Sequence, residues 1–204
     1  MTGIIDYGAG NLLSVANAVR SLGVESKIVA APEDFDGVTR LILPGVGSFG
    51  DCVENLKRQQ LWQPIKQWLA DGKPYFGICL GYQVLFESSE ETPGVEGLGH
   101  FAGQVVEFSP EAGDKIPHMG WNEVSLVDPA AAMWNGLADR THVYFVHSFF
   151  PRPADGSIVA CRTDYAGESF AAAVMSGAVW ATQFHPERSQ AAGLQLMKNF
   201  IDAN

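Results

Sequence analysis

Apolar residues in the first half of the chain follow two alternating spacings. Short segments with apolar centres at residues 2–6, 26–30 and 40–43 predict strands. Between the first two segments, apolar residues recur every three or four positions over residues 12–22, which predicts an amphipathic helix. Strands that alternate with helices in this way favour a parallel sheet covered on both faces.

A second helix is expected after the third of these strands. Asp51 is placed to cap it, and the helical pattern continues toward Leu69 with Pro64 as a kink or a restart. The apolar run that follows, residues 74–78, predicts another buried strand.

The second half of the chain is dominated by runs typical of strands, joined by turn-rich segments. The expected strands are residues 101–108, 122–127, 142–150, 157–163 and 170–182. Because no long helical pattern separates them, antiparallel pairing is expected here. A closing amphipathic helix is predicted over residues 189–201. With no repeat or linker, we predict one α/β domain over residues 1–204, with three layers and a mixed, mainly parallel sheet between helices.

Charge and cysteine content narrow the functional class. The formal net charge of -10 and the pI near 4.8 argue against nucleic acid or an anionic membrane surface as the main partner. A basic leader and an apolar run of membrane-spanning length are both missing, so we expect a cytoplasmic protein. Cys52, Cys79 and Cys161 are an odd number at wide spacing, which predicts reduced thiols. We interpret Cys52 and Cys161 as small buried apolar side chains.

Cys79 lies where a strand is expected to turn into a helix. Gly77 and Gly81 flank it, between the apolar run 74–78 and a helix-like run at 82–87. This is the pattern of a nucleophile elbow, in which glycines let the backbone pass closely and the thiol faces the free amides of the helix. Such surroundings favour the thiolate. Taken alone the pattern is weak, because buried cysteines and glycine-rich turns are common.

A base and a carboxylate follow near the end of the chain, in His185-Pro186-Glu187. On an extended backbone, two residues that are two positions apart project to the same side. Glu187 would then hold the His185 imidazole in one tautomer while the other ring nitrogen faces Cys79. The alternative is a surface turn with an ordinary histidine. Together the two motifs favour an enzyme with a cysteine nucleophile.

A glycine-rich loop follows the strand at residues 40–43. Residues 45–50 match the dinucleotide-binding spacing Gly-x-Gly-x-x-Gly, but Asp71 ends a helix instead of following the next strand, where a ribose-binding carboxylate belongs. We therefore expect the loop to contribute to an oxyanion hole: Leu80 supplies one backbone amide, and rotation of the peptide between Val46 and Gly47 supplies another.

The remaining histidines lack metal-ligand spacing, so neither a metal nor another cofactor is predicted. His142 and His147 should face opposite sides of one strand because an odd number of positions separates them. Residues 118–122 place Met119 and Trp121 in one loop, which caps the core or contacts a partner; composition does not separate the two.

These motifs resemble the class I (triad) glutamine amidotransferases. The elbow at residues 77–83 and the segment 183–187 are shared by that family. Residues 44–50, 117–122 and 144–148 resemble more narrowly its members that serve as glutaminase subunits of imidazole glycerol phosphate synthases in histidine biosynthesis. The resemblance extends from residues 4–11 to the last helix.

The resemblance implies that Cys79, His185 and Glu187 hydrolyse glutamine to glutamate and ammonia. It also implies a heterodimer in which ammonia passes to a cyclase subunit with a (β/α)8 barrel, which makes imidazole glycerol phosphate and an aminoimidazole carboxamide ribonucleotide. The implied substrate contacts are Gly47, Gln83, Glu91, Ser148 and Phe149. The implied partner contacts are Asn11, Met119, Trp121, Asn122 and Tyr144.

Two positions depart from the family pattern. Phe149 stands where relatives often carry tyrosine, so a hydroxyl contact to substrate is in doubt there, and Ser148 replaces a frequent threonine but keeps its hydroxyl. Other functions stay open: a class I glutaminase that serves a different synthase, a stand-alone cysteine amidase or peptidase, and a non-catalytic module on the same fold.

Overall fold

Parallel strands form one half of the main sheet in the computed structural model, which describes residues 1–109 and 115–203. They are β1 (Thr2–Ile5), β2 (Ser26–Val29), β3 (Arg40–Gly45), β4 (Tyr75–Cys79) and β12 (Val179–Thr182). Their order across the sheet is β2-β1-β3-β4-β12. The first four lie where strands were predicted in the first half of the chain, and β12 lies within the predicted strand at residues 170–182.

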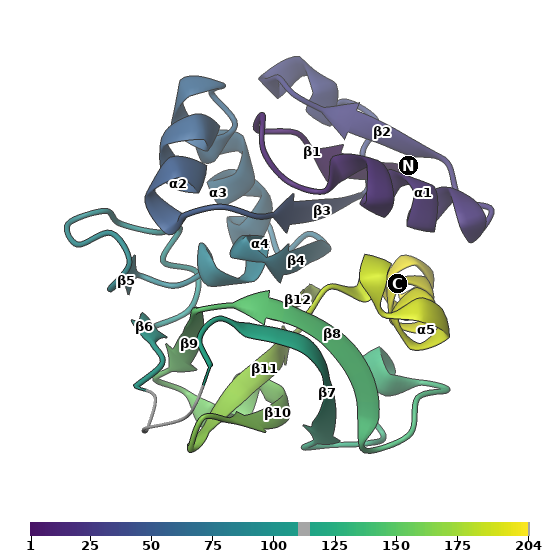
Figure 1. The fold of residues 1–204 in the computed structure, drawn as a ribbon. Helices are drawn as coiled ribbons and strands as arrows, with labels where there is room; N and C mark the ends of the chain where they lie inside the picture. The colour runs from purple at the N-terminus through teal and green to yellow at the C-terminus, as the bar shows by residue number, and fades with distance from the viewer. Residues whose placement is uncertain (110–114, 204) are drawn as a thin grey trace.

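Antiparallel strands extend the same sheet beyond β12. They are β11 (Glu168–Ser176), β10 (Val159–Tyr165), β7 (His118–Leu126) and β8 (Thr141–His147). The complete order is β2-β1-β3-β4-β12-β11-β10-β7-β8 (Figure 1). A second sheet has the order β5-β6-β9, formed by β5 (Ser88–Ser89), β6 (Gly103–Glu107) and β9 (Phe149–Pro153).

Three of the predicted elements in this half were wrong in extent. Residues 170–182 form two strands because the chain reverses at Gly177, whose φ is +55°. Residues 142–150 also divide: β8 ends at His147 and β9 begins at Phe149 in the second sheet. The predicted loop at 118–122 is the first part of β7, where pairing with β8 orders it.

Helices cover both faces of the main sheet, as predicted. They are α1 (Leu12–Ser21), α2 (Phe49–Arg58), α3 (Trp62–Ala70) and α5 (Gln190–Asp202). Apolar side chains of α1 and α5 belong to one core cluster, and those of α2 and α3 belong to the other. In Figure 1, α2 and α3 lie together on the left, and α1 and α5 lie on the right. Within the described residues, none of these helices combines the length and the apolar composition that crossing a bilayer requires.

The predicted long helix after β3 is two helices with a different cap. The Ser48 hydroxyl caps α2 by accepting a hydrogen bond from the Asp51 amide at 3.2 Å, so the prediction of Asp51 as the cap was wrong. Ser48 can do this because its backbone is extended, whereas Asp51 already lies inside the helix. The chain turns at Gln60, with φ +61°, and Pro64 then lies in the first turn of α3. A proline is tolerated there because the first amides of a helix have no intrahelical partner.

The remaining helical elements are short turns between the strands and helices: η1 (Pro32–Phe35), α4 (Leu80–Gln83), η2 (Ala132–Trp134), η3 (Gly156–Ile158) and η4 (Pro186–Arg188).

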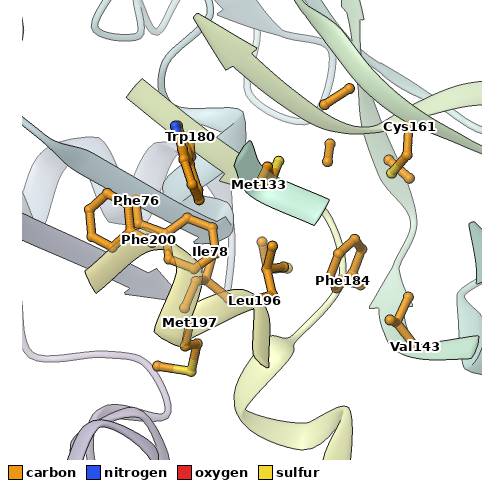
Figure 2. Close-up of a cluster of buried hydrophobic side chains, with 14 of the residues drawn as sticks. Phe76, Ile78, Met133, Val143, Cys161, Trp180, Phe184, Leu196, Met197 and Phe200 are labelled. Carbon is orange, nitrogen blue, oxygen red and sulfur yellow. The ribbon is translucent and has the colours of Figure 1, made fainter. Parts of the chain in front are cut away.

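Helix α5 packs against β4 and β12, the two strands that lead to Cys79 and to the segment 183–187. Phe76 on β4 and Trp180 on β12 both contact Phe200 of α5, with ring centroids 5.2 and 5.7 Å apart (Figure 2). Cys161 belongs to the same cluster and is labelled in Figure 2. Cys52 is buried in the opposite cluster, and neither cysteine forms a disulfide. The prediction that both act as small apolar side chains is confirmed.

Candidate active site

Cys79 lies at a strained turn between β4 and α4. Its φ of 53° and ψ of −103° place it outside the regions that side chains other than glycine adopt easily. Residues in such conformations persist only where their surroundings hold them, and they cluster at functional sites. The predicted elbow is therefore present at this position.

The helix that follows Cys79 is shorter than predicted. It covers Leu80–Gln83 and not the run 82–87. Beyond it, the Val84 and Leu85 carbonyls accept hydrogen bonds from Leu98 and His100, 2.7 and 2.8 Å away, so they are not available to continue a helix. A single turn aligns few peptide dipoles, so the thiol faces free amides but no extended macrodipole.

The two glycines beside Cys79 are required by close backbone contacts. A Cβ on Gly81 would lie 1.9 Å from the Leu43 carbonyl oxygen, and one on Gly77 would lie 2.3 Å from the Gly81 oxygen. Gly45, which pairs with Cys79 in the sheet, would place a Cβ 2.6 Å from Leu80. The elbow is thus packed backbone against backbone, as the flanking glycines predicted.

His185 reaches the thiol because β12 and β4 are neighbours. In their parallel register Thr182 pairs with Ile78, so the chain leaves both strands at the same edge of the sheet. The Ser189 hydroxyl accepts a hydrogen bond from the Tyr144 amide and donates one to the His185 carbonyl, which ties this segment to β8. Residues 79 and 185, which are 106 positions apart in the sequence, are thereby brought together by the sheet.

Glu187 orients the His185 ring. The distance from Nδ1 of His185 to Oε1 of Glu187 is 2.9 Å, and the two side chains are 2% and 1% exposed. The expected extended backbone between them was wrong, because Pro186–Arg188 form the helical turn η4. The turn still brings both side chains to one side, so the predicted contact is present for a different reason.

Burial and charge act in opposite directions on the His185 imidazole. Burial lowers its pKa, but the Cys79 sulfur and the Glu187 carboxylate outweigh that effect and raise the pKa above its ordinary value. Nε2 of His185 makes no hydrogen bond with the described protein groups, and the same holds for Oε2 of Glu187. The free ring nitrogen is therefore available to take a proton from the thiol.

The sulfur itself has two polar neighbours. The Gln183 amide nitrogen donates to Sγ of Cys79 over 3.6 Å, and the thiol lies 4.0 Å from the Val146 carbonyl oxygen. Sequence reasoning did not assign a role to Gln183, although it begins the segment 183–187 that carries the histidine and the carboxylate. An amide donor of this kind stabilises negative charge on sulfur.

A cavity of about 440 Å³ opens onto Cys79. Every residue predicted to bind substrate or form the oxyanion hole lines it: Val46, Gly47, Leu80, Gln83, Glu91, Ser148 and Phe149. The cavity has further walls that were not predicted: Pro117, Val146, His147 and Arg188. Arg188 directly follows Glu187 and could have been suspected from that position, whereas Pro117 and Val146 carry no chemical signal in the sequence.

Two cavity residues are placed by the backbone around them: Glu91 by a hydrogen bond and Gly47 by its own conformation. Oε2 of Glu91 accepts a hydrogen bond from the Phe49 amide at 2.7 Å, which places this carboxylate at the start of α2. Gly47 has φ +112°, a conformation that only glycine adopts readily, in the loop that follows β3. The loop and the elbow adjoin because Gly45 pairs with Cys79.

The predicted partner residues lie on a surface beside the cavity. Met119 is 62% exposed and Trp121 is 47% exposed, and Trp121 packs against Tyr144 with ring centroids 6.1 Å apart. The Arg188 guanidinium lies 4.1 Å from the centre of the Tyr144 ring, so this surface continues into the cavity wall. Asn11 is the residue before α1, whose helix contacts η4.

Two residues of β7 and β8 turn inward from that surface. Both amide hydrogens of Asn122 are engaged, by His118 at 3.3 Å and by the Asp164 carbonyl at 3.1 Å. Asn122 was predicted to contact a partner, but its amide group makes these hydrogen bonds within the chain. His147 is buried whereas His142 is exposed, which confirms that they face opposite sides of the strand. Across residues 1–109 and 115–203, no group of three or more histidine, cysteine, aspartate or glutamate side chains could hold a metal ion.

Comparison with known proteins identifies the family. Residues 3–203 match the model of the class I glutamine amidotransferases. A similar solved structure, a glutamine amidotransferase, has a TM-score of 0.75 at 21% identity and covers 98% of both chains. PurLQS from Thermotoga maritima has a TM-score of 0.76 at 21% identity, covering 98% of this chain and 97% of that one. At this identity the two likenesses show the fold alone.

Sequence relatives are much closer. The imidazole glycerol phosphate synthase subunit HisH of Rhodopirellula baltica is 51% identical over 203 residues, which is 100% of this chain and 98% of the relative. The subunit of the same name from Methanothermobacter thermautotrophicus is 44% identical over 202 residues, covering 99% and 98% of the two chains. The chain therefore belongs to the class I glutamine amidotransferase family and, within it, to the HisH subunits of imidazole glycerol phosphate synthase.

Proposed function

We propose that this chain hydrolyses L-glutamine with Cys79 as nucleophile, His185 as proton carrier and Glu187 as the carboxylate that orients it. The observation that carries the proposal is the strained Cys79 in the lining of a cavity, next to an imidazole whose Nδ1 is held by a buried carboxylate at 2.9 Å. This is the arrangement that activates a thiol by an adjacent base, with the base oriented by a third group.

The reaction follows from the roles of these groups. His185 takes the thiol proton at Nε2, and the sulfur attacks the carbon of the substrate's side-chain amide. The tetrahedral intermediate collapses as His185 returns the proton to the leaving nitrogen, which departs as ammonia. A water molecule, deprotonated by the same imidazole, then attacks the glutamyl thioester and releases glutamate.

The oxyanion of each tetrahedral intermediate needs donors beside the sulfur. The Leu80 amide directly follows the nucleophile and supplies one donor, as in other elbows. The Gly47 amide supplies the second when the peptide between Val46 and Gly47 turns it toward the site. Removal of one such donor costs about 3–4 kcal/mol, or roughly 10²–10³ in rate. The orientation of one peptide could therefore control most of the activity.

Polar groups around the cavity suit the amino-acid end of glutamine. Glu91 offers a carboxylate to the substrate's α-ammonium group, and the Ser148 hydroxyl offers a donor to its α-carboxylate. Both amide hydrogens of Gln83 are engaged, by Phe149 and by Gln183, so its carbonyl oxygen is the atom available to a ligand. Phe149 contributes backbone and apolar surface, since it lacks a hydroxyl.

Ammonia is then proposed to pass to a cyclase subunit with a (β/α)8 barrel. The name of the relatives, a subunit of a synthase, supports the presence of a partner subunit. Residues 1–204 act as a single glutaminase domain, and the surface of Met119, Trp121 and Tyr144 faces the barrel. Two exposed apolar side chains beside the cavity support this position, because burial of such groups drives association. The cyclase would use the ammonia to form imidazole glycerol phosphate and an aminoimidazole carboxamide ribonucleotide.

A Cys79→Ala variant of the assembled complex tests the proposal. It should lose glutamine hydrolysis while the complex still makes cyclised product from added ammonium salt, because only the ammonia supply is removed. The matched control is Cys52→Ala, which removes a buried thiol that does not line the cavity and should keep both activities. Residual hydrolysis by Cys79→Ala would reject the nucleophile, and hydrolysis by the parent without any response to a barrel partner would favour a stand-alone amidase.

A further inference from the structure

A buried pair of histidines, one of which lines the cavity, has no part in the proposed chemistry. His118 on β7 and His147 on β8 are directly opposite in the antiparallel register. Nδ1 of His118 is 3.0 Å from Nε2 of His147, and both side chains are buried. Tyr165 and Phe145 stack on the His118 ring, at centroid distances of 3.9 and 4.5 Å. Packing therefore holds the His118 ring in place.

The neighbours of the pair determine where its protons lie. Nδ1 of His147 faces the Phe149 carbonyl oxygen at 2.9 Å, and a carbonyl only accepts, so this nitrogen carries a hydrogen. Nε2 of a neutral His147 must then accept, and the donor is Nδ1 of His118. Nε2 of His118 accepts in turn from the Asn122 amide at 3.3 Å. Every donor and acceptor in this series has one possible direction.

Burial keeps both rings uncharged. It lowers the pKa of His118 to about 4. It also lowers the pKa of His147 to about 3; the Phe149 carbonyl opposes this shift, and the nearby His118 and His185 rings add to it. At neutral pH neither ring places a positive charge next to His185, and the directions of the hydrogen bonds do not change.

The series continues from the pair to the nucleophile. The Phe149 carbonyl that His147 contacts also accepts a hydrogen bond from the Gln83 amide at 3.0 Å. The other hydrogen of that amide goes to Oε1 of Gln183 at 3.2 Å. Because its oxygen is engaged in this way, Gln183 must present its nitrogen to Sγ of Cys79, 3.6 Å away. The amide faces the sulfur as a donor and not as an acceptor.

We propose that His118 and His147 are positioning residues for glutamine hydrolysis: through Phe149, Gln83 and Gln183, their fixed tautomers keep an amide donor directed at the Cys79 sulfur. The inference rests on the proposed glutaminase function. If the tautomer of His147 were reversed, a bare ring nitrogen would face the Phe149 carbonyl oxygen, and the two lone pairs would repel. The carbonyl and the Gln83 amide would then shift, which would release Gln183 to turn its oxygen toward the sulfur and disfavour the thiolate.

Two substitutions at His118 separate hydrogen bonding from packing. His118→Phe keeps an aromatic ring between its neighbours but removes the donor to His147. His118→Asn keeps a donor close to the position of Nδ1 but loses the stacking. In the complex with the cyclase subunit, we expect His118→Phe to lower kcat for glutamine about tenfold with little change in KM, the size expected for one misdirected hydrogen bond. His118→Asn should recover most of kcat while unfolding at a lower temperature than His118→Phe.

If His118 acted only through packing, His118→Phe would have the higher kcat and His118→Asn the lower one. If His118→Phe keeps the parent's kcat, or His118→Asn is the slower of the two, packing alone explains the pair and the inference is wrong. His142→Asn, at an exposed position of β8, the strand that carries His147, is the matched control and should behave like the parent.

Two further measurements do not depend on glutaminase activity. Nitrogen-detected NMR of the parent should show both imidazoles protonated at Nδ1 only; a proton on Nε2 of His147 would overturn the inference even if neither variant folds. Alkylation of Cys79 by iodoacetamide in the isolated chain should be slower in His118→Phe than in the parent. Slower alkylation in a chain that proves unable to hydrolyse glutamine would retain the positioning role and reject the proposed function.

Discussion

Gly81→Ala should be one of the most damaging single-methyl changes in this protein. The added Cβ would lie 1.9 Å from the Leu43 carbonyl oxygen, about 1.5 Å inside the 3.4 Å at which ordinary contact begins. The obstacle is backbone in the middle of β3, so it cannot rotate away as a flexible side chain would. Either β3 must separate from β4 or the elbow must move.

Both responses are costly. A separation of 1.5 Å would stretch N–H···O distances from about 2.9 Å to about 4.4 Å, which breaks the hydrogen bonds between the strands around Leu43. At about 1 kcal/mol for each bond, and with the usual 1–3 kcal/mol of overpacking, we expect a loss of about 3 kcal/mol in the free energy of unfolding. If the elbow moves instead, the thiol shifts by more than 1 Å, which can cost about 10²-fold in rate.

Urea unfolding of the isolated chain and glutaminase assays of the complex measure the two outcomes. Gly156→Ala is the control, because a Cβ there meets nothing within 4 Å and the backbone is not left-handed. It should change stability by less than about 1 kcal/mol and leave activity unchanged. Gly81→Ala within 1 kcal/mol of the parent, with activity retained, would show that the close approach of β3 to the elbow does not constrain the site.

Three other predictions concern the triad, the partner surface and pH. Glu187→Gln should lower kcat less than His185→Ala, because the carboxylate orients the ring whereas the ring moves the protons. Trp121→Asp should weaken association with the cyclase subunit and uncouple glutamine hydrolysis from cyclisation, as titration and product assays would detect. Stability should fall by about 2 kcal/mol from pH 6.5 to pH 5 on account of His147: the unfolded residue binds a proton below its ordinary pKa, whereas the folded one, with its pKa lowered to about 3, does not.

Each of these has a clear contrary result. An equal or greater loss at Glu187, with assembly intact, would reverse the roles of the two residues. Unchanged binding and coupling in Trp121→Asp would remove this surface from the interface. Equal urea midpoints at pH 6.5 and pH 5 would show that His147 is not held neutral.

Local chemistry in the sequence determined much of the fold and the central residues of the site. Apolar spacing was sufficient for β1, α1 and α5 because each of these elements buries one continuous stripe or run. Gly77 and Gly81 indicated the elbow because a side chain at either position would overlap backbone. His185 and Glu187 were recognisable as partners because they are two positions apart, although the turn that joins them was not expected.

Only the tertiary structure decided which distant residues complete these local features. The helix after Cys79 ends after one turn because Leu98 and His100 occupy its next carbonyls. Residues 170–182 form two strands because Gly177 reverses the chain, and β12 then pairs with β4.

The direction of the amide beside the thiol likewise depends on residues that are distant in sequence. Gln83 meets Gln183 across 100 positions, and His118 meets His147 across 29. Periodicity and local steric requirements extend over a few residues, so they indicate where a strand, a helix or a sharp turn forms. Hydrogen bonds between separate strands depend on sheet order and register, which are set by the packing of the whole chain.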